Sequence, residues 1–292
     1  MAAVIASSLL AFSLLLVGVN ALMVDYYAET CPGVEEAVEE AVKKATANDN
    51  TVPAALLRMH FHDCFIRGCD GSVLVDSQGN NTAEKGRATQ HLPPRILPLA
   101  ARDAVAISGG PIWEVPTGRK DGKISRASDT SQLPAPTFNF SQLKQSFSQR
   151  GLSTGNLVAL SGGHTLGFAH CSSFQNRIHN FDATDDVDPS MNPAFADSLR
   201  KACPAHNKVR SAGSAMDSTN TVFDNAYYKL LLQGKSLFSS DEALLTHPKT
   251  MELVARFADS QKAFERAFVK AMIRMSSLTG GDGVRLDCRV VT

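Results

Sequence analysis

The sequence predicts a mostly α-helical fold, and three kinds of observation support this prediction. Apolar residues recur at helical spacing, as in residues 34–47, where Val34, Val38 and Val42 are spaced four apart. Proline, serine and glycine residues stand where helices begin and end, and no run of alternating polar and apolar residues indicates an exposed sheet. A chain of 292 residues is long enough for one large domain or for two lobes around a shared site.

Helices are expected at several places along the chain. One helix is expected to begin at Pro53, a good residue for a first helical turn, and to continue through His62 until glycines at 68–71 interrupt it. Gly109-Gly110-Pro111 ends another helix, and a short strand is predicted at Trp113–Val115. The remaining helices are expected over residues 34–47, 99–107, 140–150, 155 to about 165, and 251–275.

Charge and the N-terminal residues limit the class of protein. Lys and Arg number 29 and so do Asp and Glu, so no excess charge indicates binding to nucleic acid or to an anionic membrane. An apolar run at 9–19 is followed by Val19-Asn20-Ala21, which predicts a signal peptide at 1–21 with cleavage after Ala21. The run is short for a membrane span, although an uncleaved anchor is the alternative.

The cysteines and sequons fit an exported protein. All six cysteines lie after the leader, and an even number in an exported chain indicates disulfide bonds. Asn80-Asn81-Thr82 and Asn139-Phe140-Ser141 are glycosylation sequons at Asn80 and Asn139, each of which also occurs by chance.

The segment 58–65 has the first candidate catalytic residues. Arg58 and His62 are four residues apart on one helix face, with Phe61 beside them. A cation and a titratable base in such a place suit a pocket that deprotonates a substrate and stabilises negative charge. His60 points elsewhere, which disfavours a zinc-binding pair. A core histidine and a surface arginine are the plain alternative.

His164 stands at an expected helix end, directly after Gly162-Gly163. Two glycines allow a flat, bulky cofactor to approach without a side-chain clash, and histidine is a common axial ligand of haem iron. A zinc site formed by His164, His170 and Cys171 is the alternative.

Two oxygen-rich segments have the ligands that hard cations prefer. Asp63, Asp70 and Ser72 bring side-chain oxygens, and carbonyls are available at Ile66 and Gly68. Residues 217–224 form the second segment, which is able to join Thr165 around another calcium ion. Solvated loops explain either segment taken alone.

Together these segments resemble the class III secretory plant peroxidases, the horseradish peroxidase family, over nearly the whole chain after the leader. The segments that carry the resemblance are Arg58-x-x-Phe61-His62-Asp63-Cys64-Phe65, Gly68-Cys69-Asp70-Gly71-Ser72, Ala83-Glu84-Lys85, Ala100-x-Arg102-Asp103, Gly109-Gly110-Pro111-x-Trp113, Gly118-Arg119-x-Asp121-Gly122, Leu133-Pro134-Ala135-Pro136, Leu160–Gly167, Phe223-Asp224-Asn225-x-Tyr227-Tyr228 and Arg285-x-Asp287-Cys288.

The resemblance implies a mostly α, two-lobed haem peroxidase domain over 22–292, with haem b between the distal and proximal lobes. His62 looks like the base that takes a proton from hydrogen peroxide and returns it to the leaving oxygen, and Arg58 like the group that stabilises the developing negative charge. His164 looks like the iron ligand and Asp241 like the carboxylate that accepts its other ring N–H. Pro134 matches the residue whose carbonyl touches reducing substrates.

The resemblance further implies two calcium ions, one in each lobe, and two disulfides, Cys64–Cys69 and Cys171–Cys203. The first calcium site would use oxygens of Asp63, Ile66, Gly68, Asp70, Ser72 and Glu84. The second would use oxygens of Thr165, Asp217, Thr219, Val222 and Asp224.

One segment departs from the family pattern. Near residues 86–98 the chain is shorter than the family by about one helix and the start of the next. Two family cysteines are missing with it, so Cys31 and Cys288 lose their usual partners, and we expect thiols there rather than a new bridge between them. The asparagine that orients the distal histidine has no secure match, Gln90 being the nearest residue.

The function implied is a secreted enzyme that reduces hydrogen peroxide and oxidises small phenolic donors in one-electron steps. A monomer in the apoplast or cell wall is expected, with the vacuole as an alternative. The deletion leaves a second hypothesis open, an inactive or haem-poor protein that only binds calcium or the cell wall. The apolar leader, the paired cysteines and the calcium-type loop argue against an intracellular ascorbate-type peroxidase.

Overall fold

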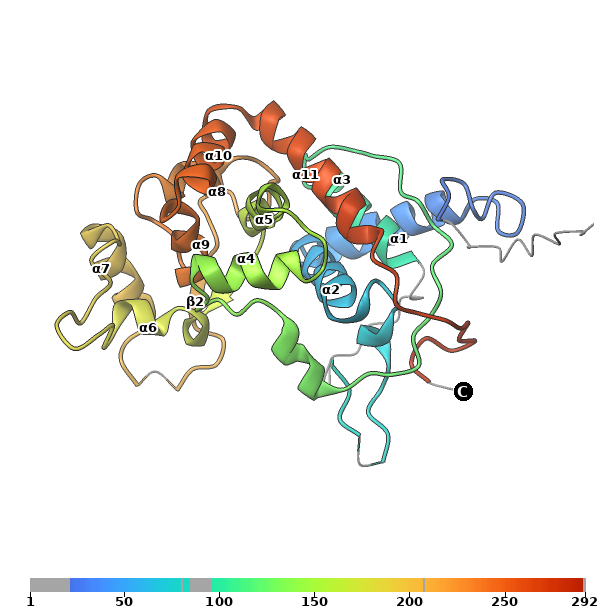
Figure 1. Ribbon diagram of the computed structural model, residues 1–292, viewed down its shortest axis with the longest axis horizontal. Helices are drawn as coiled ribbons and strands as arrows, with labels where there is room; N and C mark the ends of the chain where they lie inside the picture. The colour runs from blue at the N-terminus through green and yellow to red at the C-terminus, as the bar shows by residue number, and fades with distance from the viewer. Residues whose placement is uncertain (1–21, 80, 85–95, 207, 291–292) are drawn as a thin grey trace, which may run out of the picture.

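Helices dominate the fold, which confirms the predicted class (Figure 1). The computed structural model describes residues 22–79, 81–84, 96–206 and 208–290. The predicted leader at 1–21, Asn80, Gln90 and most of the segment near 86–98 that is predicted to be shortened lie outside the described residues. The α-helices are α1 Val34–Asn48, α2 Val52–Arg67, α3 Leu97–Ile107, α4 Phe140–Ser148, α5 Thr154–Ser161, α6 Gln175–Ile178, α7 Pro193–Ala202, α8 Ala226–Leu231, α9 Ser239–Glu242, α10 Pro248–Asp259 and α11 Gln261–Ser276.

Short 3-10 helices and one small sheet connect these helices. Strands β1 and β2 pair antiparallel, with Ala169 opposite Ser214. None of the described helices has the length and apolar character needed to cross a membrane. The 3-10 helices are η1 Ser72–Leu74, η3 Ala127–Gln132, η4 Gly162–Thr165, η5 Cys171–Ser173 and η6 Ala243–Leu245, and the strands are β1 Phe168–His170 and β2 Gly213–Ala215.

The main core lies where α2 packs on α3 and where α11 packs on α5. Phe223, Phe264 and Phe268 are almost fully buried there and contact one another edge-on or stacked. Burial of such a ring contributes about 1.5–3 kcal/mol to stability. The core therefore fixes α2 relative to the chain around α5, and both positions carry predicted site residues.

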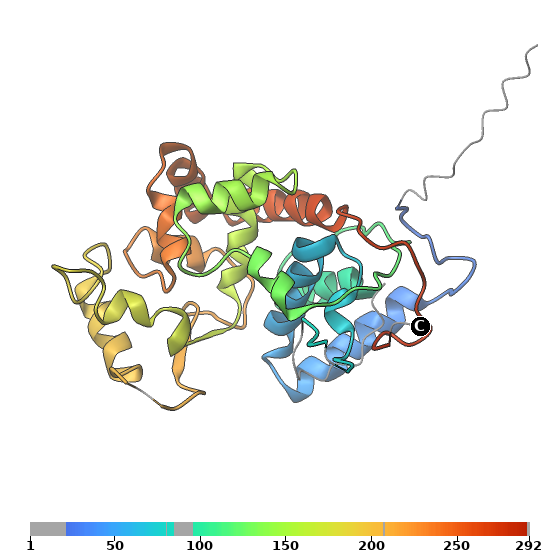
Figure 2. The same ribbon diagram turned by 60° about the horizontal axis from the view of Figure 1, so that its bottom comes forward.

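A second, smaller core belongs to α6, α7 and the β1–β2 sheet, which stand apart from the main body (Figures 1 and 2). Phe174 and Ile178 are fully buried in it. The disulfide Cys171–Cys203 joins the start of η5 to the end of α7 beside this core. The residues of this core form a cluster separate from the main core.

Two of the predicted helices end earlier than the sequence-based expectation. The single helix predicted over 251–275 is wrong: α10 ends at Asp259, and Ser260 is extended and caps α11 by accepting a hydrogen bond from the Ala263 amide. A serine hydroxyl favours such a cap over a helix interior. The helix predicted to run to about 165 ends at Ser161 and tightens into η4.

The strand predicted at Trp113–Val115 is also wrong. No strand is assigned at these residues, and the nearest pairing comes later, where Thr117 forms an isolated bridge with Met23. Trp113 is buried with its ring edge-on to Phe268. The segment is therefore held by packing of that side chain rather than by strand pairing.

The cysteines fall into two groups. Cys64–Cys69 and Cys171–Cys203 are disulfide-bonded in the structure. Cys31, which is exposed, and Cys288, which is half-buried, are thiols. The structure thus agrees with the prediction of thiols at Cys31 and Cys288 rather than a bridge between them.

Candidate active site

Helix α2 presents Arg58 and His62 on one face. Thr51 precedes the helix, Pro53 lies in its first turn, and Gly68 ends it with a left-handed φ of 90°. A side chain at Gly68 would approach the Thr279 backbone to 3.0 Å, so the stop is fixed by packing as well as by φ. Arg58 Nε donates a hydrogen bond to His62 Nε2 at 3.3 Å. The helix thus brings the two predicted residues into contact.

The imidazole of His62 is in the neutral form that a general base requires. Burial lowers the pKa of its imidazole to about 4, and the positive charge of Arg58 adds to the effect. His62 is therefore neutral at ordinary pH and is able to accept a proton. His60 points away from it, is fully buried and hydrogen-bonds Ser276 Oγ at 2.8 Å, so the two histidines form no metal pair.

His164 is held in η4, directly after α5. Ser153 and Asn156 form a reciprocal capping box that fixes the start of α5. Gly162 has no room for a side chain, because an added Cβ would lie 2.3 Å from Phe264 and 2.5 Å from the Tyr228 hydroxyl. The His164 side chain is 40% exposed. The backbone geometry thus leaves the imidazole open on one side.

Asp241 orients His164. Nδ1 of His164 donates to Asp241 Oδ1 at 2.8 Å, across 77 residues of sequence. The rings of Tyr227 and Phe238 stand edge-on to the imidazole, with centroids 5.8 and 5.3 Å away. No partner of Nε2 occurs within the described part of the chain. The arrangement leaves Nε2 with its lone pair available, as an axial iron ligand requires.

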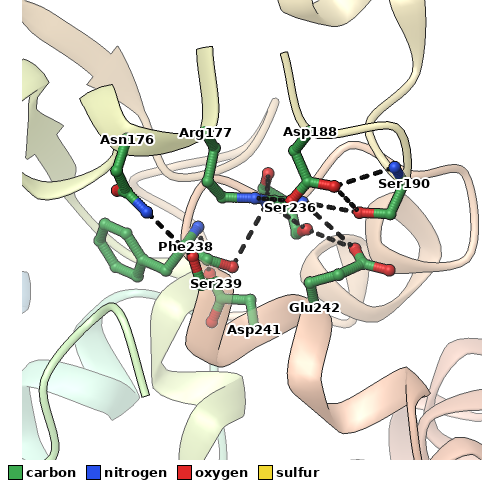
Figure 3. Close-up of polar contacts among 9 residues, drawn as sticks. All are labelled: Asn176, Arg177, Asp188, Ser190, Ser236, Phe238, Ser239, Asp241 and Glu242. Atoms are coloured by element: carbon green, nitrogen blue, oxygen red, sulfur yellow. Dashed lines mark hydrogen bonds and ion pairs between the residues drawn. The ribbon is translucent and has the colours of Figure 1, made fainter. Parts of the chain in front are cut away.

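A buried arginine anchors the segment that carries Asp241 (Figure 3). Arg177 in α6 donates from Nη1 to the carbonyl of Ser236 at 2.6 Å and to that of Phe238 at 3.3 Å. Its Nε donates to Asp188 Oδ2 at 2.8 Å. Because the charge is fully buried but paired, these contacts hold residues 236–242 in one position.

The histidine-bearing elements α2 and η4 contact each other. A Cβ on Gly163 would lie 3.4 Å from Leu57 Cδ2, so the residue before His164 faces the residue before Arg58. Helix α2 presents the neutral base His62 with the cation Arg58, and η4 presents the imidazole of His164 with its Nε2 open. These donors fit haem with His164 as the iron ligand.

Two buried acidic oxygens of the first predicted calcium site lack a hydrogen-bond partner among the described residues, although Arg67 Nε lies 4.0 Å from one of them, Glu84 Oε1. Oδ1 of Asp63 and Oε1 of Glu84 accept no hydrogen bond from the described residues. Burial, with repulsion from Asp70, holds the pKa of Asp63 well above its usual range and raises that of Glu84 to about 7. Ser72 Oγ lies 3.5 Å from Glu84 Oε2. A cation among these oxygens would relieve the repulsion.

The second predicted calcium site brings together residues from distant positions. Thr165 Oγ1 donates to Asp217 Oδ2 at 2.6 Å and lies 3.2 Å from Asp224 Oδ1. Thr219 Oγ1 also lies 3.2 Å from Asp224 Oδ1. Val222 is 45% exposed, and its amide donates to the Thr219 carbonyl. Within the described residues no three His, Cys, Asp or Glu side chains form a complete metal site, so calcium would also need hydroxyl and carbonyl oxygens.

The other predicted residues lie outside these clusters. Pro134 is half-buried just after η3, and Ile66 and Gly68 lie at the end of α2 near Asp63 in sequence. Asn139 is exposed and caps α4, its side chain accepting from the Gln142 amide. The alternative zinc site is excluded because Cys171 is bonded to Cys203. Sequence reasoning did not find Arg177 or a role for Tyr227, since neither lies beside a candidate residue in the chain.

Comparison with known proteins identifies the family. A sequence model of the peroxidase family matches residues 38–92 and 95–260. The chain is 61% identical to Peroxidase 64 of Arabidopsis thaliana over 297 residues, covering 94% of each protein. It is 50% identical to Peroxidase 66 of the same plant over 281 residues, covering 88% of this chain and 87% of the relative. The helical fold and these similarities show that the chain belongs to the class III plant peroxidases and is a haem-dependent peroxidase.

Proposed function

We propose that residues 22–292 form a secreted enzyme that reduces hydrogen peroxide and oxidises small phenolic donors. One observation carries the proposal: the neutral base and cation of α2 lie on an element in contact with the oriented imidazole of η4. The family uses haem and hydrogen peroxide with small-molecule donors. Haem b at His164, phenols as donors and a monomeric state are the parts specific to this proposal.

His62 and Arg58 would handle protons and charge. Bound haem supplies the iron at which hydrogen peroxide is reduced. Neutral His62 accepts the proton from the first peroxide oxygen and gives it to the second, which leaves as water. Arg58, whose guanidinium contacts His62, stabilises the negative charge that develops as the O–O bond breaks. In this proposal Pro134 lies where the donor binds.

His164 and Asp241 would set the electron donation from the protein to the iron. An imidazole that donates its Nδ1 proton to a buried carboxylate is a stronger ligand through Nε2. The buried Arg177 network keeps that carboxylate in place. Groups of this chain would therefore both orient the proximal imidazole and make it a stronger ligand.

The proposal also includes a signal peptide at the N-terminus and a missing helix near residues 86–98. A signal peptide at 1–21 would direct the mature chain to the apoplast or cell wall. The family match breaks between residues 92 and 95, inside the interval near 86–98 where the sequence is shorter than the family pattern. This break supports a missing helix there, and with it a distal histidine without its usual asparagine.

The mature chain provides the test of the function. Residues 22–292 should be expressed and refolded with haem and calcium, and the product examined for a Soret band and for oxidation of guaiacol by hydrogen peroxide. We expect both, because the residues needed for haem ligation and peroxide cleavage are in place. A folded protein that binds no haem, or binds haem without any turnover, would contradict the proposal.

Calcium removal should destabilise the fold. Without a cation, Oδ1 of Asp63 and Oε1 of Glu84 accept no hydrogen bond from the described residues, so a chelator should lower the thermal midpoint. A drop of about 5–10 °C is expected when calcium had been present at about a hundred times its dissociation constant. Differential scanning calorimetry measures it. Asp63→Asn should reduce the calcium effect, whereas Asp182→Asn, in an exposed loop, should not; equal effects would contradict the site.

A further inference from the structure

One oxygen of Asp241 accepts two hydrogen bonds. Oδ1 accepts from His164 Nδ1 at 2.8 Å and from the Tyr227 hydroxyl at 2.9 Å. Among the described residues, the other oxygen, Oδ2, accepts one longer bond, from the Phe238 amide at 3.2 Å. Both Asp241 and Tyr227 are buried, with 2% and 4% of their surfaces exposed. The carboxylate that orients His164 therefore shares its negative charge with a phenol.

The Tyr227 hydroxyl is the donor in its bond to Asp241, because a carboxylate oxygen accepts and has no proton to give. Tyr227 is the second residue of α8, and its ring packs edge-on against the rings of both Tyr228 and His164. The hydroxyl thus has a fixed position next to Oδ1 of Asp241.

A second donor on the same oxygen weakens the first bond. When a carboxylate oxygen accepts one hydrogen bond, part of its negative charge is neutralised, and it becomes a weaker acceptor for a second hydrogen bond. With Tyr227 in place, His164 meets a less basic oxygen and keeps its Nδ1 proton more tightly. Removing the phenol hydroxyl, while keeping the ring, would make Oδ1 more basic and strengthen the bond from His164.

We propose that Tyr227 is a positioning residue that sets the strength of the His164–Asp241 hydrogen bond, and through it the electron donation of His164 to iron. The proposal rests on the proposed role of His164 as the iron ligand. Tyr227 touches neither substrate nor haem in this account, and it acts only through Asp241. The Tyr227 hydroxyl thereby limits the anionic character that Asp241 alone would give to the His164 imidazole.

Tyr227→Phe tests the proposal, and Tyr228→Phe is the matched control. Tyr228 is the next residue, is equally buried and donates its hydroxyl to the Val158 carbonyl at 2.8 Å, away from Asp241. In the haem-loaded ferrous protein, resonance Raman spectroscopy reports the Fe–His stretching band. Tyr227→Phe should shift this band to higher frequency and lower the Fe(III)/Fe(II) reduction potential, whereas Tyr228→Phe should leave both unchanged.

A haem-free measurement separates this proposal from the proposed function. Proton NMR of the ¹⁵N-histidine apoprotein reports the His164 Nδ1–H resonance, which moves downfield as its hydrogen bond shortens. A downfield shift in Tyr227→Phe alone supports the proposal. An unchanged or upfield resonance in that variant overturns it, whatever the haem data show. Retention of the Raman band in His164→Ala would instead contradict the proposed iron ligand while leaving the NMR result valid.

Discussion

His62→Ala should slow the reaction with hydrogen peroxide by at least about a hundredfold, the lower end of the range for general acid–base catalysis, while haem stays bound. The reason is that His62 is the neutral base on α2, with its pKa near 4, and no second base takes its place. His60, two positions away, is fully buried against Ser276 and faces another part of the core. Stopped-flow absorbance at the Soret band after mixing with peroxide measures the rate.

Two variants control for indirect effects of the His62 change. His170→Ala removes an exposed ring from β1, outside the proposed site, and should keep the parent rate. Arg58→Ala should also slow the reaction, because the guanidinium that contacts His62 is lost. A His62→Ala protein that reacts as fast as an active parent would refute the assigned role. A parent that is already slow would point instead to the predicted loss of the distal asparagine.

His164→Ala should abolish the native haem spectrum, and this is the largest effect expected of any single substitution. The imidazole is the one group in η4 with an open nitrogen directed away from its carboxylate partner. Losing an axial ligand removes the strongest bond between protein and iron. Absorbance of the Soret band after titration with haem measures the outcome.

Chemical rescue distinguishes a lost ligand from a lost fold. Free imidazole should restore part of the haem spectrum of His164→Ala, since the space left by the side chain lies next to Asp241. The far-UV circular dichroism of the variant should match the parent, because His164 is 40% exposed and contributes little to the core. An unaltered haem spectrum in His164→Ala would refute the axial assignment.

Local features of the sequence predicted the helices and the pairs that lie on one helix. Arg58 and His62 are four residues apart, so helical geometry alone brings them together, and their observed contact needs no other part of the chain. The ends of α2 follow from Pro53 and Gly68. The exception is residues 251–275, where apolar periodicity continues through Ser260 although the helix does not. Periodicity reports the buried face, and a capping serine is able to end a helix without interrupting that face.

The sequence by itself determined the helical class, the two disulfide pairs expected from the family and the residue types of the site. Only the tertiary structure decided which of them meet across long separations. Asp241 reaches His164 across 77 residues, and Tyr227 and Arg177 reach the same carboxylate segment from α8 and α6. No local propensity encodes such contacts. They form because burial of the aromatic cores fixes the helices relative to one another, and each buried polar group must then find its partner among the side chains brought to it.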